Sequence, residues 1–238
     1  MIKIQIKNRF TGSIIFEYEK ENNTIKKTVA QYIKEEIEKG KTHADLNSAD
    51  LSYADLRSAD LSYADLSYAN LTHADLNYAN LRSANLTHAD LTHADLNYAD
   101  LRYADLSPAN LRYANLRSAN LSYANLSYAN LSSANLSSAD LSYADLTHAD
   151  LNYADLRSAN LRSANLSYAN LDKRYIQVSC IGSNKRMTTY CFEDDIIWCG
   201  CFKGTLKEFE EKVNETHANN AQYLKEYLGF ISYVKSLK

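Results

Sequence analysis

The sequence predicts a solenoid of short repeats with a small non-repetitive cap at each end. From Ala44 to Leu171 the chain repeats Ala, then Asp or Asn, then Leu, then two further residues, without an insertion. A period of five matches neither regular element, because a leucine at every fifth position changes direction on a helix and on a strand. The flanking segments 1–43 and 172–238 lack the repeat. We therefore expect three domains with these boundaries.

Each position of the repeat has an expected role. Asp or Asn before each Leu suits a turn, because these side chains bond to nearby backbone and tolerate unusual φ and ψ. We expect the chain to turn a corner about once per repeat, with Ala and Leu inward and the last two residues outward. Such a unit cannot bury its apolar face alone, so neighbouring units must stack.

The repeated motif resembles that of the pentapeptide-repeat family. It runs from Ala44-Asp45-Leu46 to Ala169-Asn170-Leu171 and covers 128 of the 238 residues. The resemblance implies a mainly β fold, a right-handed quadrilateral β-helix with four pentapeptides per coil. The twenty-six repeats of this chain would then make about six and a half coils. In this family a Leu and Ala core lies inside coils that are joined by β-type hydrogen bonds.

Four repeats per coil place each residue against the residue twenty positions later. At the Asp/Asn position, seventeen of the twenty-two pairs at this spacing join an Asp to an Asn, which relieves repulsion between stacked carboxylates. The fifth position gives columns of rings by the same spacing. The predicted columns are Tyr53, His73, His93 and Tyr113; Tyr103, Tyr123 and Tyr143; and Tyr68, His88, Pro108, Tyr128, His148 and Tyr168.

These aromatic columns have two main interpretations. Offset stacking would stiffen the solenoid, at about 0.5–1.5 kcal/mol per pair. Exposed tyrosines are also the residues that protein partners contact. A metal shared by His73 and His93 is a third interpretation, but no Cys or second carboxylate column completes a site. We therefore predict neither a metal nor another cofactor.

The repeats are acidic. They hold 14 Asp and 7 Arg, a net charge of −7, and the consecutive Asp90, Asp95, Asp100 and Asp105 are a candidate acidic surface. Some members of the family that the chain resembles mimic DNA and protect DNA gyrase from quinolones, so a DNA mimic is an alternative function. The expected coils would span about 30 Å, and duplex DNA of this length carries roughly 18 negative charges. The net charge of the repeats is smaller, because their arginines offset part of the acidic charge.

The segment 1–43 predicts a hairpin and a helix. Ile2 to Ile6 alternates in polarity, Ile14 to Tyr18 does so in part, and Asn8 to Gly12 supplies the turn. A helix is expected from Thr24, as N-cap, to Lys39. Its apolar residues recur at every fourth position: Ile25, Val29, Ile33 and Ile37. We expect this face to seal the first coil, which otherwise exposes leucines and strand edges.

The segment 172–238 predicts a small α+β cap. Strands are expected at 175–181, 187–192 and 196–202, with a turn at 182–186. Thr205 and Glu208 form a capping-box pattern that opens a short helix to Val213. A second helix over 218–237 places one apolar stripe along its length: Tyr223, Tyr227, Phe230, Ile231 and Val234. Stretches similar to 200–206 (GCFKGTL) occur in other bacterial pentapeptide-repeat proteins.

The cysteines are confined to this segment, as Cys180, Cys191, Cys199 and Cys201. In a reducing compartment we expect them to be free and buried. Cys199-Gly200-Cys201 is not the C-x-x-C pair of zinc ribbons or redox proteins. A Cys nucleophile acting with His217 is the third functional alternative, an enzyme in the C-terminal segment.

The favoured hypothesis is a non-catalytic interaction or scaffolding protein whose rigid repeat surface meets an unidentified protein partner. We expect no direct nucleic-acid binding, and a monomer or a homodimer. No apolar run approaches the ~20 residues of a membrane span. The N-terminal residues lack the apolar core of a secretory signal, so we expect a cytoplasmic protein.

Overall fold

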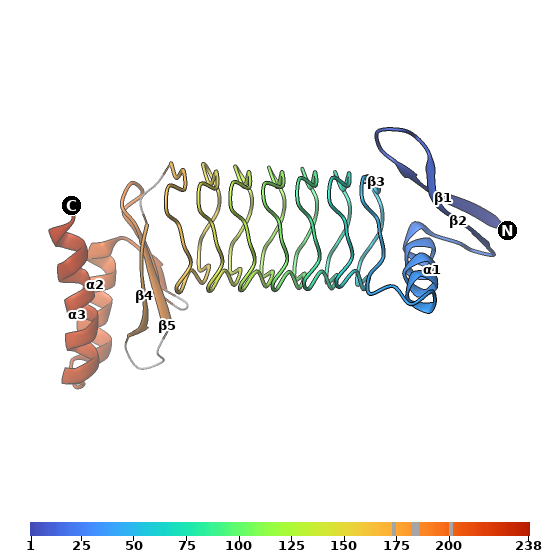
Figure 1. Cartoon of the computed structure of the whole chain (residues 1–238). Coiled ribbons are helices and arrows are strands. Elements are labelled where there is room, and N and C mark those ends of the chain that lie inside the picture. The colour runs from blue at the N-terminus through green and yellow to red at the C-terminus, as the bar shows by residue number, and fades with distance from the viewer. Residues whose placement is uncertain (173–174, 182–185, 200–201) are drawn as a thin grey trace. The chain divides into compact units, whose positions relative to one another are not determined.

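A computed structural model of the chain describes residues 1–172, 175–181, 186–199 and 202–238. It divides into two compact units, Met1–Asn170 and Leu171–Lys238. The first unit contains the repeats, which Figure 1 shows as coils that follow one another in chain order. Each unit is described below by itself.

The coils of the first unit are twenty residues long. Parallel bridges join each Asp or Asn to the residue twenty positions later, from Asp45 with Asp65 to Asp150 with Asn170. In the first of these steps the Leu46 N–H donates to the Asp65 carbonyl at 2.7 Å, and the Asp65 N–H donates to the Ala44 carbonyl at 2.9 Å. Four pentapeptides therefore form one coil.

Each corner of a coil is a hydrogen-bonded turn. The Ala49 N–H donates to the Leu46 carbonyl at 3.0 Å, and the same bond recurs along the repeats. The Asp or Asn side chain supports the turn, as where Asp45 Oδ1 accepts from the Asn47 N–H at 3.1 Å. From residue 48 to residue 168, the fifth residue of the repeat has φ between +54° and +62°, with Pro108 as the exception. This left-handed conformation is uncommon for the Tyr, His and Ser residues found there.

Leucine and alanine form the core of the coils. From Leu46 to Leu151 the leucines are at most 1% exposed. Asn side chains join neighbouring coils outside this core, as where Asn80 Nδ2 donates to Asp60 Oδ1 at 3.0 Å. The alternation of Asp and Asn therefore does more than separate like charges, because it supplies a donor for an acceptor.

The hairpin and the first coil share a sheet. Strands β1 (Ile2–Asn8) and β2 (Ile14–Lys20) pair antiparallel, and β1 also pairs with β3 (Ala49–Asp50) in the first coil. The sheet order is β2-β1-β3. The hairpin thus covers part of the edge that we expected the helix to seal, and this long-range pairing has no signal in the local pattern.

Helix α1 (Ile25–Glu38) begins at the predicted cap, where Thr24 Oγ1 accepts from the Lys27 N–H at 3.2 Å. The predicted face is wrong in part, because Ile37 is 50% exposed. Apolar residues at every fourth position drift by about 40° per step, so Ile37 lies about 120° from Ile25 around the helix. Val29 of the predicted face is buried, together with Thr28, Tyr32 and Glu36.

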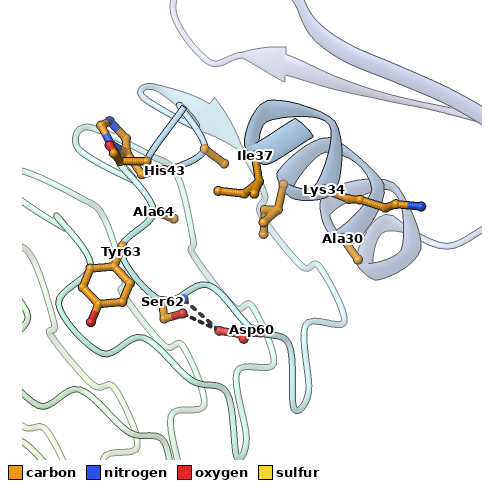
Figure 2. Close-up of a pocket in the computed structure, with 11 residues that line it drawn as sticks. Ala30, Lys34, Ile37, His43, Asp60, Ser62, Tyr63 and Ala64 are labelled. Atoms are coloured by element: carbon orange, nitrogen blue, oxygen red, sulfur yellow. Dashed lines mark hydrogen bonds between the residues drawn. The ribbon is translucent and has the colours of Figure 1, made fainter. Parts of the chain in front are cut away.

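Two buried polar side chains of α1 have specific partners. Tyr32 Oη donates to the Asp45 carbonyl in the first coil at 2.9 Å. Glu36 is buried and pairs with Lys39 and Lys41, and these hydrogen bonds lower the pKa of its carboxyl group. Ile37 borders a cavity of about 370 Å³ between α1 and the coils, together with Tyr63 and Ala64 (Figure 2).

The second unit is a sheet with two helices. Strands β4 (Tyr175–Ile181), β5 (Arg186–Cys191), β6 (Ile196–Cys199) and β7 (Phe202–Gly204) pair antiparallel in chain order. The single strand predicted over 196–202 is wrong, because β6 and β7 are two paired strands. The predicted turn at 182–186 falls largely, and Cys201 entirely, outside the described residues.

The helices of this unit are α2 (Leu206–His217) and α3 (Ala221–Ser236). The predicted capping box is present, with Thr205 Oγ1 accepting from the Glu208 N–H and Glu208 Oε2 accepting from the Thr205 N–H. Four of the five residues of the predicted stripe on α3 are buried, and Tyr223 is half-buried. The core is formed by Tyr190, Ile197, Leu206, Phe209, Val213, Tyr227, Phe230, Ile231 and Val234.

Candidate interaction surface of stacked aromatic rings

Four aromatic residues form the stack that we name the Tyr53 stack: Tyr53, His73, His93 and Tyr113. Their successive ring centroids are 4.8–4.9 Å apart and their planes are within 12° of parallel. Each residue occupies the left-handed fifth position of its turn, and the next coil repeats that turn one strand spacing away. The backbone therefore holds the rings in register.

The structure also brings together the residues of the second predicted column, here the Tyr103 stack (Tyr103, Tyr123 and Tyr143). Their centroid distances are 5.1 and 4.8 Å. The third column is divided into two stacks. Tyr68 stacks on His88 at 4.7 Å, and the other stack contains Tyr128, His148 and Tyr168, at 4.8 and 4.9 Å.

Pro108 separates these two stacks. Its ring fixes a negative φ, so it cannot adopt the left-handed turn of the other fifth positions. In this column the Tyr68 and Tyr128 N–H groups donate to the carbonyls of Thr87 and Thr147. Within the described part of the chain, His88 has no equivalent bond, and Pro108 has no N–H to donate. The interruption therefore affects both backbone and rings.

A fifth stack was not predicted. Tyr78 and Tyr98 have centroids 5.0 Å apart and planes within 8°. The spacing of twenty residues also connects this pair, so the sequence contained the signal. Arginines add further contacts, with the Arg82 guanidinium 5.7 Å from the Tyr103 ring and the Arg112 guanidinium 4.6 Å from the Tyr113 ring.

The stacked rings remain accessible to solvent. Tyr53 is 74% exposed, Tyr123 49% and Tyr168 81%. Stacking covers ring faces, and the edges and hydroxyl groups stay at the surface. The repeats thus present ordered amphipathic side chains, which are suited to protein contacts.

The four predicted acidic residues do not form one patch. Asp90, Asp95, Asp100 and Asp105 are half-buried and belong to four different columns, because each is one repeat from the next along a single coil. Each of them bridges to an Asn in the following coil: Asn110, Asn115, Asn120 and Asn125. Their charges therefore form a belt around one coil.

Arginines neutralise part of this acidic charge. Arg102 pairs with Asp100 at 2.6 Å, and this hydrogen-bonded pair lowers the pKa of the Asp100 carboxyl. Arg57 pairs with Asp55 at 2.7 Å and lowers the pKa of that carboxyl to about 2. These ion pairs leave fewer free carboxylates than the composition suggests.

The geometry of the histidines does not suit a shared metal. The planes of His73 and His93 are within 4° of parallel. Ring nitrogens present their lone pairs in the ring plane, so these two rings do not converge on a common point. Among the residues with described positions, no three His, Cys, Asp or Glu side chains form a group able to hold a metal ion.

The cysteine and histidine of the proposed enzyme alternative are separated by a tyrosine. Cys199 is half-buried, and its sulfur accepts from Thr188 Oγ1 at 3.1 Å. Its thiol faces Tyr227 Oη at 4.0 Å, and His217 stacks on the Tyr227 ring at 5.3 Å. Burial raises the pKa of the other described free thiol, Cys191. A deprotonated nucleophile is not favoured there.

Comparisons with solved structures give repeat proteins of similar sequence. Rfr23 from the cyanobacterium Cyanothece 51142 is 36% identical over 39% of this chain, with a TM-score of 0.39. HetL, a protein involved in heterocyst differentiation regulation from Nostoc sp. strain PCC 7120, is 41% identical over 52%, with a TM-score of 0.26. QnrB1, a plasmid-mediated fluoroquinolone resistance protein, is 25% identical over 54%, with a TM-score of 0.27.

The matched regions span 64%, 67% and 77% of these three proteins. The chain therefore covers slightly less than two thirds of Rfr23. A comparison with curated proteins found no match. None of the described helices has the length and apolar character needed to cross a membrane.

A family model supplies the identification. The model for pentapeptide repeats matches residues 42–77, 74–112, 99–138 and 139–173, which together make up more than half of the chain. These residues contain the coils, the Leu and Ala core and all of the aromatic stacks described above. The chain belongs to the pentapeptide repeat family.

Proposed function

We propose that this protein is a non-catalytic interaction or scaffolding protein that presents its aromatic stacks to a protein partner. In this proposal the coils form a right-handed quadrilateral β-helix of about six and a half turns. The observation that carries the proposal is the exposure of rings whose spacing is fixed by the backbone. The Tyr53 and Tyr103 stacks are the candidate contact surfaces.

Pre-ordering favours such a role. Binding usually restricts the side chains of an interface, which opposes association. A ring held between two others has already lost much of this freedom during folding. Tyrosine also combines an apolar body with a hydroxyl group, and such residues often dominate binding energy.

The remaining parts of the proposal concern the flanking segments and the setting. Segments 1–43 and 172–238 serve as caps of the repeat domain 44–171. The protein acts in the cytoplasm, as a monomer or a homodimer, without a cofactor and without direct contact to nucleic acid or membrane.

Affinity capture from native cell extract tests this function. The bait is the full chain, compared with a variant of both candidate surfaces that carries Tyr53→Ser, Tyr113→Ser, Tyr103→Ser, Tyr123→Ser and Tyr143→Ser. Serine occupies the same left-handed position in other repeats, so the coils should remain folded. We expect the partner of the wild-type protein to be lost or strongly reduced. The double variant Tyr78→Ser, Tyr98→Ser is the matched control for loss of rings elsewhere, and equal capture by all three proteins contradicts the proposal.

A DNA mimic acting on a DNA-binding enzyme such as DNA gyrase is the second candidate, because the repeats carry a net charge of −7. The belt arrangement and the arginine pairs support it less well than the rings support a protein contact. The test changes Asp90, Asp95, Asp100 and Asp105 to Asn and measures gyrase supercoiling and partner capture. We expect no effect on the function. A folded variant that no longer binds the partner favours the mimic instead.

A further inference from the structure

The Tyr53 stack ends at a missing ring. Residues 133 and 153 continue its column, and they are Ser133 and Tyr153. Two coil steps separate Tyr113 from Tyr153, and one coil step corresponds to one ring of the stack. The place of one ring is therefore taken by the small side chain of Ser133.

A cavity lies at this place. It has a volume of about 450 Å³ and is lined by Tyr113, Tyr153, Ser132 and Ser133, with polar groups from Arg112, Asn130, Asp150 and Asn152. Tyr153 is 76% exposed and Tyr113 is 42% exposed, so the cavity opens to solvent beside both rings.

The Tyr103 column contains an equivalent gap, and a planar group lies beside it. Ser83 interrupts the column between Tyr63 and Tyr103, and the Arg82 guanidinium lies 5.7 Å from the Tyr103 ring. Tyr123 covers the opposite face of Tyr103, so the guanidinium lies on the Ser83 side. A flat side chain thus lies on the face of Tyr103 that borders the equivalent gap.

Arg112 partly covers the gap at Ser133. Its guanidinium lies 4.6 Å from the Tyr113 ring and donates to Tyr113 Oη at 2.9 Å. His93 stacks on one face of Tyr113, which leaves the guanidinium on the face toward Ser133. Arg112 is exposed, so it can move aside when a ring enters. The entering ring then replaces one cation–π contact by contacts with two rings.

We propose that the Ser133 gap binds one aromatic side chain of a partner protein. The neighbouring rings define the shape of the occupant, and Asp150 at the same cavity offers a carboxylate acceptor. Tyr, Trp or His is therefore preferred over Phe, because these rings carry an O–H or N–H donor. This inference rests on the proposed interaction function, for which it names the contact.

An NMR titration of the full chain tests the gap directly. The probe is N-acetyl-L-tyrosinamide, with N-acetyl-L-leucinamide as the non-aromatic comparison and adenosine as a planar base. We expect the tyrosine probe to shift the backbone amide signals of Ser133 and Tyr153. Equal binding of the leucine probe overturns the proposal. Tighter binding of adenosine also overturns it, because the gap would then favour a nucleobase over an aromatic side chain of a protein.

Filling the gap gives the sharper comparison. Ser133→Tyr should complete the stack and weaken binding of the tyrosine probe at least tenfold. Ser138→Tyr is the matched control, because residue 138 has the same turn conformation and has Ser118 and Ser158 as its column neighbours. It should leave binding unchanged, and Arg112→Ala should strengthen binding a few-fold. Unchanged binding by folded Ser133→Tyr overturns the proposal, and Ser133→His replaces this variant if the tyrosine prevents folding.

Partner capture separates the two proposals. If Ser133→Tyr still captures the wild-type partner, the gap is not the contact and the interaction function stands. If the tyrosine probe binds at Ser133 but the wild-type chain captures no partner, the gap binds rings and the interaction function fails.

Discussion

The aromatic rings of the repeats lie parallel, whereas those of the C-terminal unit meet mainly at an angle. In the stacks of the repeats the ring planes differ by 2–12°. In the C-terminal unit they differ by 77° for Tyr190 and Phe192 and by 84° for Phe209 and Tyr227. Coils repeat one backbone conformation by translation, so equivalent rings must be parallel. No such translation relates the rings of the C-terminal unit, so most of its ring pairs meet at an angle.

The two regions also use their rings for different purposes. Phe209 and Tyr227 are 3% and 7% exposed and form the core of the C-terminal unit. In the repeats, leucine and alanine already supply the core, and the rings stand at the surface. The repeats are thus able to present aromatic side chains without giving up their apolar interior.

The largest expected effect comes from a charge in the core of the coils. Leu111 is fully buried, and Leu111→Asp places an unpaired carboxylate between stacked coils. We expect a loss of at least about 3 kcal/mol of unfolding free energy and cooperative disruption of the neighbouring coils. Thermal unfolding followed by circular dichroism measures it. A variant that melts within about 2 °C of the wild type shows that Leu111 does not face inward.

The corresponding change in the other core is Phe209→Ala. Removing this ring leaves a cavity in a core built from few large side chains, at about 3–5 kcal/mol. We expect the C-terminal unit to unfold early while the aromatic signals of the coils persist in NMR spectra. Simultaneous loss of both sets of signals contradicts the division into two units.

How far the sequence predicts each region follows from where its contacts arise. One repeat determines the inward Leu, and the family resemblance supplies the twenty-residue coil, so the columns that contain Tyr123 and His93 follow by counting. The pairing of β1 with β3 joins parts of the chain that no local pattern connects. The buried face of α1 was misplaced because Tyr32 and Glu36 are polar by type, and only their partners make their burial favourable.

The candidate site, too, is predicted by the sequence only in part. Spacing alone places the rings in columns, and it includes the Tyr78 and Tyr98 pair that we did not predict. It does not predict where the guanidinium groups of Arg82 and Arg112 lie, because each of these long side chains can reach several rings. The cavity at Ser133 is lined by Arg112 and is visible only in the structure.

Removing a surface ring should have a smaller effect than either core change. Tyr123→Ser deletes two ring contacts, one with Tyr103 and one with Tyr143, and should lower the unfolding free energy by about 1–2 kcal/mol. Tyr78→Ser deletes only its contact with Tyr98 and should have about half this effect. Urea unfolding measures both variants. Equal losses for the two substitutions would show that ring stacking does not determine the effect.

Tyr32 links stability to pH at the first coil. Burial raises its pKa from 10 to about 12, so the folded state retains a proton that the unfolded chain releases. The resulting stabilisation is complete below pH 10 and is lost as the pH rises through about 12. Tyr32→Phe removes the hydrogen bond to Asp45 and should lower stability by about 0.5–1.5 kcal/mol near neutral pH.

Comparing the wild type with Tyr32→Phe between pH 10 and 12 separates the contribution of Tyr32 to the pH dependence of stability from that of the other tyrosines. We expect their difference in unfolding free energy to decrease between pH 10 and 12. Tyr190 in the other core also has a raised pKa, because of burial and its bond to Asp195, so Tyr190→Phe is the parallel variant for that unit. A pH-independent difference for Tyr32→Phe means that its hydroxyl group is not protected in the folded protein.

The smallest expected effect is that of replacing a serine by glycine, which should stabilise the repeats and destabilise the C-terminal unit. Ser118 has φ of +56° and lies in a column next to Ser138, so Ser118→Gly removes no ring. Relief of the left-handed strain, about 1–2 kcal/mol, should exceed the added freedom of the unfolded chain, about 0.5–1 kcal/mol, and stabilise the coils slightly. Ser232 is exposed on α3, where Gly should instead destabilise by about 0.5 kcal/mol. Chemical unfolding of both variants gives the two signs, and a loss of stability in both means that the turn conformation carries little strain. The repeats would then tolerate tyrosine at the fifth position at no conformational cost, and the stacks would add their full contact energy to the fold.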